Sequence, residues 1–400
     1  MTAFDRPTAW LTDWLPEIIG WRQDFHRHPE LLFDLPRTAG RVAQLLRSFG
    51  CDSVVEGIGR SGVVGVIQGA RQASGQSSGQ SPGRVIGLRA DMDALPIMER
   101  TGREYTSTVP GKMHACGHDG HMSMLLAAAK YLAATRDFDG TVVVIFQPAE
   151  EGGGGGREMV QDGLMDRFAI QEVYGMHNMP GLPVGQFCIR PGAMMAAADQ
   201  FEITVTGKGG HAARPQDGVD TMLVAAHIVV AAQSIISRNT DPMAQAVLSI
   251  CTMSGDSTAH NVIPQVVKMR GTVRSLDPAV QDRVERRLND LVTGTAQAFG
   301  ATGMLDYRRG YPVTVNALAQ TGYAADVARR VAAGPVDAET VPQMWAEDFS
   351  FMLNARPGAY IFTGNGDSAA LHHPEYDFND AALPFGAAWY IGMAEARLAP

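Results

Sequence analysis

Hydrophobic residues recur with different spacings along the chain, and each spacing predicts a different kind of element. Between residues 8 and 50 they return every three or four positions, which predicts helices interrupted at Pro29. Residues 54–68 are predicted to form a pair of strands. Three later segments are almost continuously apolar, as are strands buried on both faces of a parallel sheet. These segments span residues 85–90, 141–146 and 173–176.

Helical stretches at residues 122–135 and 157–165 alternate with these strands, which predicts a largely parallel sheet. Ligands of such sheets bind beyond the carboxyl ends of the strands. Acidic residues or a histidine stand at the end of all three strands. They are Asp91 and Asp93, Glu150 and Glu151, and His177. Scattered polar residues need not align in this way, so the alignment indicates a site.

From about residue 199 onward apolar and polar residues alternate, which predicts antiparallel strands with one solvated face. Two amphipathic helices accompany these strands in a βαββαβ-like order. The strands are expected at residues 200–206, 246–251 and 266–274, and the helices at residues 218–236 and 277–299. From about residue 310 the first pattern returns, with a buried strand at residues 359–362.

We therefore expect an α/β protein of two domains, which suits a chain of 400 residues. Residues 1–192 and 309–400 are expected to form a catalytic, metal-binding domain, in which helices flank a mixed, mostly parallel sheet. Residues 193–308 are expected to form an inserted α+β lid domain built on an antiparallel sheet. Residues 70–83, rich in Gly, Ser and Gln, are expected to form a mobile surface loop.

Composition narrows the class of protein. Apolar residues make up 45% and charged residues 19%, as in soluble globular proteins. A formal net charge of -9 argues against a broad nucleic-acid surface. The four cysteines share no C-x-x-C spacing, so no disulfide framework is indicated. Residues 1–20 hold no secretory signal, and the longest apolar segment, residues 222–236, is too short to span a bilayer. We expect a cytoplasmic protein with no membrane partner.

The segment Cys116-Gly117-His118-Asp119-Gly120-His121 gathers one thiol, two imidazoles and a carboxylate. These groups are the usual ligands of zinc and related divalent metals. The same segment could be a loop held by hydrogen bonds, but the polar strand ends favour a metal site. His26 and His28 could also be ligands, although polar packing around the turn at Pro29 explains them more simply.

Glu150 and Glu151 are adjacent at a strand end, so their side chains point in different directions. One can bind metal while the other accepts a proton from water, which is the arrangement that hydrolysis needs. The glycines at 152–156 allow close backbone approach, and no Gly-Lys-Ser/Thr follows them that would indicate a phosphate loop. His177 and the pair His372-His373 could add ligands, and a fifth ligand would allow two metals to share a bridge.

Six motifs, in their order along the chain, resemble the dinuclear-metal aminoacylase and carboxypeptidase family. The branch that the chain resembles is that of hippurate hydrolases and indole-acetyl-amino-acid hydrolases. The motifs are Arg89-Ala-Asp-Met-Asp-Ala-Leu-Pro96, Cys116-Gly-His-Asp-Gly-His121, Gln147-Pro-Ala-Glu-Glu-Gly152, Gly175-Met-His177, Gly209-Gly-His-Ala-Ala213 and Leu371-His-His-Pro-Glu-Tyr-Asp-Phe378.

The resemblance implies a role for each matching position. It implies two divalent ions per subunit, either manganese, zinc, cobalt or nickel, with the thiolate in the bridging position. The implied ligands are Cys116, His118, Glu151, His177 and His372. The other implied roles belong to Glu150 as general base, Asp91 and Asp119 as carboxylates that orient ligands, His211 as an oxyanion stabiliser, and Asn261 and Arg274 as grips for the substrate carboxylate. His373 stands where the family usually has asparagine, so it could replace His372.

The resemblance also implies a reaction. Water on the dinuclear centre attacks the amide of an N-acyl or N-aroyl amino acid such as hippurate, with Glu150 as base, and releases a carboxylic acid and an amino acid. The family typically forms homodimers through the lid, from which His211 reaches the partner's site. One alternative is a dipeptidase or carboxypeptidase, in which Asp348 could hold a free amino group. The other is a non-catalytic metal-binding relative.

Overall fold

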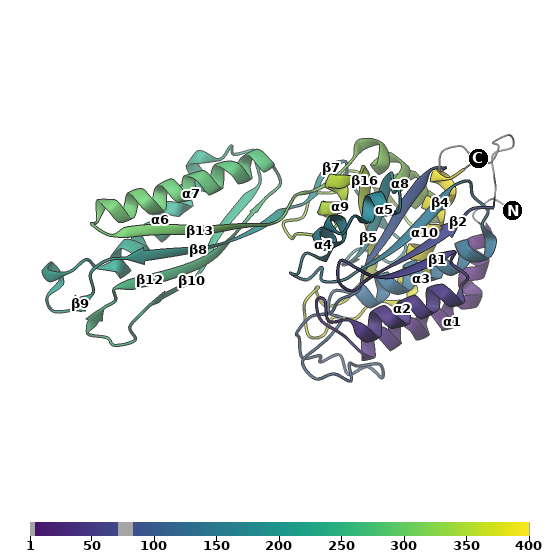
Figure 1. Ribbon diagram of the computed structural model, residues 1–400, viewed down its shortest axis with the longest axis horizontal. Coiled ribbons are helices and arrows are strands. Elements are labelled where there is room, and N and C mark those ends of the chain that lie inside the picture. The colour runs from purple at the N-terminus through teal and green to yellow at the C-terminus, as the bar shows by residue number, and fades with distance from the viewer. Residues whose placement is uncertain (1–4, 71–82, 400) are drawn as a thin grey trace. The chain divides into compact units, whose positions relative to one another are not determined.

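The computed structural model describes residues 5–70 and 83–399, so most of the loop predicted at residues 70–83 lies outside the described residues. The chain divides into two compact units (Figure 1). The first unit comprises Met1–Gly192, Val315–Val341 and Asp348–Pro400. The second unit comprises Ala193–Thr314 and Pro342–Glu347.

An eight-stranded mixed sheet forms the centre of the first unit, with the strand order β1-β2-β4-β3-β5-β16-β6-β15. The inner pairs β4–β3, β3–β5 and β5–β16 are parallel, whereas β1–β2 and β2–β4 are antiparallel. The strands are β1 Ser53–Ile58, β2 Gly62–Gln68, β3 Val85–Asp91, β4 Thr141–Gln147, β5 Glu172–Pro180, β6 Phe187–Cys188, β15 Val336–Asp337 and β16 Gly358–Gly366. Every residue of β3 is buried, as expected for a strand covered on both faces. The predicted α/β class is confirmed.

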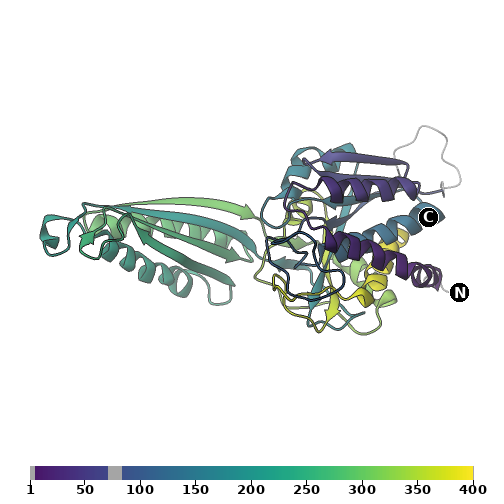
Figure 2. The same cartoon turned by 90° about the horizontal axis from the view of Figure 1, so that it is seen from below.

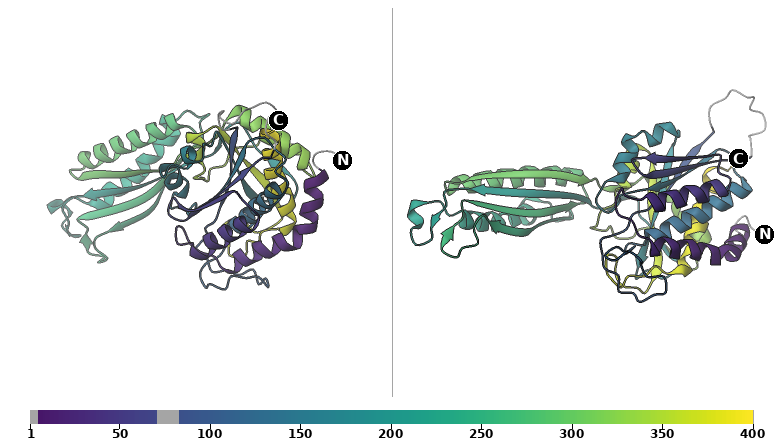
Figure 3. Two further views of the ribbon diagram at one scale, coloured as in Figure 1. Left: turned by 45° about the vertical axis from the view of Figure 1, so that its right-hand side comes forward. Right: turned by 60° about the horizontal axis from the view of Figure 1, so that its bottom comes forward.

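Helices of the first unit share a hydrophobic core with the sheet. That core takes side chains from α1, α2, α3, α8 and α10, and Figure 3 shows the purple helices α1 and α2 on one side of the sheet. The helices are α1 Asp5–Arg27, α2 Pro36–Ser48, α3 His118–Thr135, α4 Gly155–Gln161, α5 Leu164–Arg167, α8 Leu318–Val331, α9 Ser350–Ala355 and α10 Leu383–Arg397. The single helix predicted at residues 157–165 is divided into α4 and α5, because Gly163 adopts a left-handed conformation between them.

Helix α3 carries the motif at residues 116–121 into the interior. It packs against α1 and α10, and nearly all of its residues are buried, so it is apolar around its whole circumference after the first turn. Gly117 precedes the helix with a φ of 85°, a left-handed conformation that suits glycine. The first turn of α3 therefore places His118 and His121 inside the protein, next to the strand ends.

The second unit is a four-stranded antiparallel sheet with both of its long helices on one face (Figure 2). The elements are β8 Ala197–Thr206, α6 Thr221–Asn239, β10 Ala246–Gly255, β12 Val266–Ser275, α7 Pro278–Ala298 and β13 Thr302–Tyr311, in the sheet order β10-β12-β8-β13. Odd-numbered residues of β8 are buried against the helices and even-numbered ones face away, as the predicted alternation requires.

The shorter elements of the two units are β7 Gly192–Met195, β9 Gly210–His211, β11 Val262–Ile263, β14 Thr314–Asn316 and the 3-10 helices η1 Pro215–Asp217 and η2 Asp380–Ala382.

Helix α6 is longer than the apolar segment predicted at residues 222–236. By length and composition alone it could cross a membrane, but a core helix of a soluble protein passes the same test. Val224, Ile228 and Ile235 of α6 are buried against the sheet of the second unit. One such helix is weak evidence for a membrane span.

Candidate metal centre and active site

The predicted ligands lie toward the carboxyl ends of β4 and β5, around the start of α3 and in the loop after β16. His177 is near the end of β5, Glu151 follows β4, and His118 is the first residue of α3. Cys116 lies in the turn before α3, and His372 lies in the loop after β16. Parallel strands end at one edge of a sheet, so residues from distant parts of the sequence meet there.

The side chains of the five predicted ligands form one cluster. Sγ of Cys116 is 3.4 Å from Nε2 of His177. Oε1 of Glu151 is 3.3 Å from Nε2 of His372 and 3.8 Å from Nε2 of His118. The ligand atoms of Cys116, His118 and His177 all lie within 4.8 Å of one another, and so do those of Cys116, Glu151 and His372. Cys116 therefore belongs to two triads of ligand atoms.

Hydrogen bonds decide which ring nitrogens face this cluster. Nδ1 of His118 donates to the backbone oxygen of Asp93 at 2.7 Å, and Nδ1 of His177 donates to that of Asn178, also at 2.7 Å. Both rings then present Nε2 to the cluster. Nε2 of His118 is buried and has no hydrogen-bond partner within the part of the chain that the structure describes. A buried polar atom without a partner is costly, and a metal ion would satisfy it.

His121, the second imidazole of the motif, has a different environment. Its Nδ1 lies 2.6 Å from Oδ1 of Asp91, and its Nε2 accepts the backbone N–H of Asn178 at 2.9 Å. Both ring nitrogens are thus occupied by protein groups. The structure separates His118 from His121 as a candidate ligand, which the sequence alone could not do.

Asp93 holds the segment that carries the two glutamates. Its carboxylate accepts the backbone N–H groups of Glu150 at 2.9 Å and Glu151 at 3.1 Å. Ala149 precedes them with a φ of 54°, a strained conformation for a residue with a Cβ. The side chain of Glu150 is buried and one of its oxygens lies near ligand atoms of His118 and Glu151. Sequence reasoning noted Asp93 at a strand end but gave it no role, although its i, i+2 spacing from Asp91 was a usable signal.

His372 and His373 point to different partners. The backbone N–H of His372 donates to the oxygen of Ala115 at 2.8 Å, which brings its side chain to Glu151. Nδ1 of His373 instead accepts the backbone N–H of Glu375 at 3.1 Å. His372 has a φ of 63°, a second strained conformation beside the cluster. The structure therefore brings His372, and not His373, to the other ligands.

The cluster carries an excess of buried negative charge. Burial disfavours the imidazolium of His118, but the charges of Asp91 and Glu151 and a hydrogen bond to Asp93 outweigh it and raise the pKa of His118 to about 10. Burial, with the charges of Glu151 and Glu150, raises the pKa of Cys116 well above its usual value. Burial acts in opposite directions on the two pKa values, but the neighbouring carboxylates raise both of them, because their negative field favours positive charge at this place. Such a field attracts divalent cations as well as protons.

In the second unit His211 and Asn261 lie together. His211 of β9 pairs with Val262 of β11, and the backbone oxygen of Asn261 accepts the N–H of Ala212 at 3.0 Å. This pair of short strands lies beyond the end of the sheet at which β12 begins, where Figure 1 labels β9. The side chains of His211 and Asn261 are exposed.

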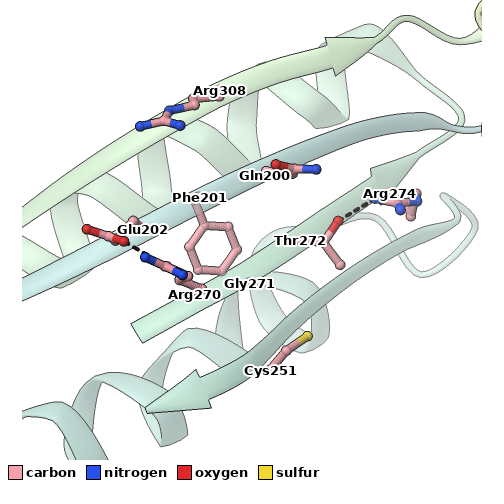
Figure 4. Close-up of a pocket in the computed structure, with 9 residues that line it drawn as sticks. All are labelled: Gln200, Phe201, Glu202, Cys251, Arg270, Gly271, Thr272, Arg274 and Arg308. Atoms are coloured by element: carbon pink, nitrogen blue, oxygen red, sulfur yellow. Dashed lines mark hydrogen bonds and ion pairs between the residues drawn. The ribbon is translucent and has the colours of Figure 1, made fainter. Parts of the chain in front are cut away.

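Arg274 lies near the other end of β12. It is eight positions after Val266, the first residue of β12, which corresponds to a span of roughly 26 Å in a strand. Asn261 precedes Val266, so most of the length of β12 lies between Asn261 and Arg274 of one chain. Their role in gripping the substrate carboxylate stays a prediction. Arg274 donates to Thr272 on the open face of the sheet (Figure 4). It lines a pocket of about 570 Å³ with Arg270 and Arg308, which sequence reasoning did not single out.

Comparisons with known proteins agree with this geometry. The model of the peptidase family M20/M25/M40 matches residues 87–396. The chain belongs to this family. A hippurate hydrolase from Campylobacter jejuni is 40% identical over 389 residues, which cover 95% of this chain and 98% of the relative. An IAA-amino acid hydrolase from Arabidopsis thaliana is 35% identical over 396 residues, which cover 96% of this chain and 87% of the relative.

A solved structure extends the comparison to the fold. It is the crystal structure of a dinuclear metal-binding peptidase of the M20 family from Bacillus subtilis, with a TM-score of 0.82 and 30% identity. The match covers 97% of this chain and 99% of that chain. The predicted resemblance is confirmed, and the protein is an amidohydrolase of this family. The donor set of thiol, imidazole and carboxylate, with the unpartnered Nε2 of His118, fits divalent metal ions.

Asp119, which the resemblance implied would orient a ligand, has other partners. Its Oδ2 lies 2.8 Å from Nδ1 of His26 and 3.4 Å from Nη1 of Arg22, both on α1. Asp119 follows His118 on a helix, so its side chain is rotated by about 100° from that of His118. The carboxylate of Asp91, in contrast, bonds His121 and lies 3.7 Å from Nε2 of His118.

Asp348 is also committed to other groups. Its carboxylate accepts from Arg89 at 3.2 Å, from Gln147 at 2.6 Å and from the backbone N–H of Gly156 at 2.8 Å. The side chain is fully buried. The idea that Asp348 holds the free amino group of a dipeptide is therefore contradicted by its surroundings.

Proposed function

We propose that the protein hydrolyses the amide bond of N-acyl or N-aroyl amino acids, such as hippurate, and releases a carboxylic acid and an amino acid. The convergence of five ligand side chains beside Glu150 is the observation that carries this proposal. The names of the relatives, a hippurate hydrolase and an IAA-amino acid hydrolase, support the substrate class. The carboxylate of Asp348 is engaged by Arg89 and Gly156, so one anionic partner that the amino group of a dipeptide would need is already occupied.

The two triads of ligand atoms support a centre with two divalent ions, either manganese, zinc, cobalt or nickel. Cys116, His118 and His177 would hold one ion, and Cys116, Glu151 and His372 the other, with the thiolate of Cys116 as the bridge. Divalent ions bound there lower the pKa of water and polarise a carbonyl oxygen.

Glu150 is proposed as the general base. Its side chain is buried beside His118 and Glu151, and Asp93 fixes its backbone. From this position its carboxylate accepts the proton of the attacking water and delivers it to the departing amine. The neighbouring Glu151 faces His372 and His118, and we propose it as a metal ligand.

We propose a cytoplasmic homodimer as the active form, and the edge strands of the lid sheet support its dimeric state. The edge strand β10 contains no charged residue and no proline, whereas the opposite edge, β13, carries Asp306, Arg308 and Arg309. Uncharged edge strands are templates for pairing, and a second copy of β10 is the proposed occupant. In such a dimer, His211 and Asn261 of one chain would act on the substrate bound by the partner. The partner's own Arg274 would grip the carboxylate of that substrate.

The proposed function is tested with a substrate panel and one variant. The panel contains benzoyl-glycine, N-acetyl and indole-acetyl amino acids, and unmodified dipeptides, assayed with each of the four metals. We expect turnover of N-acyl amino acids and a loss of about 10²–10⁴-fold in kcat for Glu150→Ala with its metal content unchanged. Glu158→Ala, a change in the half-exposed Glu158 of α4, is the matched control and keeps full activity. Preference for dipeptides, or no amide hydrolysis by metal-loaded protein, would refute the proposal.

A further inference from the structure

Asn178 follows the proposed ligand His177 in β5 and is almost completely buried. Its side-chain amide makes three polar contacts, each with a different part of the site. Nδ2 donates to the backbone oxygen of Cys116 at 2.7 Å and lies 3.1 Å from Nε2 of His121. Oδ1 accepts the hydroxyl of Tyr376 at 2.7 Å. One amide thus joins three separate segments around the cluster.

Tyr376 fixes which way this amide points. Its hydroxyl is buried, and burial raises the pKa of Tyr376 well above its usual value. The phenol therefore keeps its proton and donates it to Oδ1 of Asn178 at 2.7 Å. The amide nitrogen is then directed to the oxygen of Cys116, an acceptor that can only pair with a donor.

Close packing reinforces the hydrogen bonds. A Cβ added to Gly117 would lie 2.3 Å from Nδ2 of Asn178 and 2.5 Å from Oη of Tyr376. Real Cβ atoms do not approach other atoms so closely, and Gly117 also has a left-handed φ of 85°. The turn that carries Cys116 is therefore pressed directly against the Asn178–Tyr376 pair.

The backbone of Asn178 gives the two neighbouring imidazoles opposite roles. Its oxygen accepts Nδ1–H of His177, which leaves Nε2 of His177 directed at Sγ of Cys116. Its N–H donates to Nε2 of His121, which occupies the nitrogen that could otherwise bind a metal. The amide nitrogen of the side chain approaches the same Nε2.

We infer that Asn178, oriented by Tyr376, is a positioning residue that fixes the bridging thiol of Cys116 and keeps His121 out of the ligand set. The inference rests on the proposed dinuclear centre and adds to it the group that selects its ligands. Polar groups behind metal ligands commonly contribute 10–100-fold to metal affinity. Asn178 bonds the backbone oxygen of Cys116 and Nδ1 of His177, neither of which is a proposed ligand atom.

Three variants test the inference. Asn178→Leu removes the amide at similar volume, Asn178→Asp places an acceptor against the oxygen of Cys116, and Tyr376→Phe removes a single hydroxyl. The matched control is Asn316→Leu. Asn316 is equally buried and makes three comparable hydrogen bonds, to Arg190 and Tyr360, away from the cluster.

Metal affinity is measured by chelator competition, and the thiolate-to-cobalt absorption band of cobalt-loaded protein reports the geometry of Cys116. We expect Asn178→Leu to bind the more weakly held ion about 10–100-fold less tightly and to shift the band, with Asn178→Asp more severe and Tyr376→Phe milder. Asn316→Leu loses comparable thermal stability but keeps the affinity and the band.

Two results separate the inference from the proposal on which it rests. If wild-type protein holds two ions and is active, but the three variants match it in affinity and spectrum, Asn178 positions nothing and the inference fails. If wild-type protein binds no stoichiometric metal, the proposed centre itself fails. A band that shifts equally in Asn316→Leu would also overturn the inference, because loss of stability alone would then explain the change.

Discussion

Nε2 of His372 lies 3.3 Å from Oε1 of Glu151, although one residue follows β16 and the other follows β4. Both loops reach this point through unusual backbone. His372 has a φ of 63°, and Ala149, two residues before Glu151, has a φ of 54°. A left-handed conformation costs a residue with a Cβ roughly 1–2 kcal/mol, so the surrounding hydrogen bonds must hold both loops in place. This strain at two ligand loops is typical of a functional site.

The pair His372-His373 gives a direct prediction. His372→Ala removes a proposed ligand and should lower kcat/KM at least about 100-fold, with loss of one ion per subunit. His373→Ala removes only an acceptor for the N–H of Glu375, so activity and metal content should stay near wild type. Elemental analysis and steady-state kinetics check both. The reverse pattern would show that His373 is the ligand.

Removal of metal should destabilise the protein. The buried carboxylates of Asp93 and Glu151 repel each other, and a cation beside them weakens this repulsion. An ion that binds only the folded state also stabilises it. We expect chelator treatment to lower the melting temperature of wild-type protein. Cys116→Ala should melt at one temperature with or without chelator, because the bridge is gone. An equal response of both proteins to chelator would contradict the role of Cys116.

Periodicity and motif order predicted the α/β class, the three parallel strands and the meeting of the five side chains proposed as ligands. The pattern of apolar and polar residues predicts these features because buried strands are apolar and their ends are polar. It does not show the direction of a side chain within a motif. His118 and His121 are the same residue type on one helix turn, and only their partners, Asp93 and Asn178, distinguish them.

The position of Asp119 shows the same limit. It was expected beside a ligand, but one step along α3 turns its carboxylate toward His26 and Arg22. The sequence likewise did not show that the length of β12 lies between Asn261 and Arg274. Distance and direction in folded elements are not recorded by a linear motif.

His26 should make stability depend on pH. Burial disfavours its imidazolium, but Asp119 and Glu99, one at each ring nitrogen, raise the pKa of His26 to about 9 from 6.5. Arg22, Tyr105 and His114 also face this group. The stabilisation is complete below pH 6.5 and is lost as the pH rises through 9, because the folded state binds the proton more tightly. The difference corresponds to about 3 kcal/mol.

Urea unfolding between pH 6 and pH 10 measures this effect. Wild-type stability should fall across the window from pH 6.5 to pH 9, and His26→Gln should be less stable at pH 6 with a flatter profile. His227→Gln changes an exposed histidine of α6 and is the control that keeps the wild-type profile. An unchanged pH profile in His26→Gln would exclude His26 as the source.

Subunit mixing tests whether His211 serves the partner's site. His211→Ala and Glu150→Ala should each be nearly inactive alone. In a mixed dimer the chain with intact Glu150 faces the intact His211 of its partner, so one of the two sites is complete. Equal mixing should restore about a quarter of wild-type activity, since half of the dimers are mixed and each has one working site. Size-exclusion chromatography of differently tagged chains must first show exchange. If mixed dimers form and stay inactive, His211 acts within its own chain or has no role in turnover.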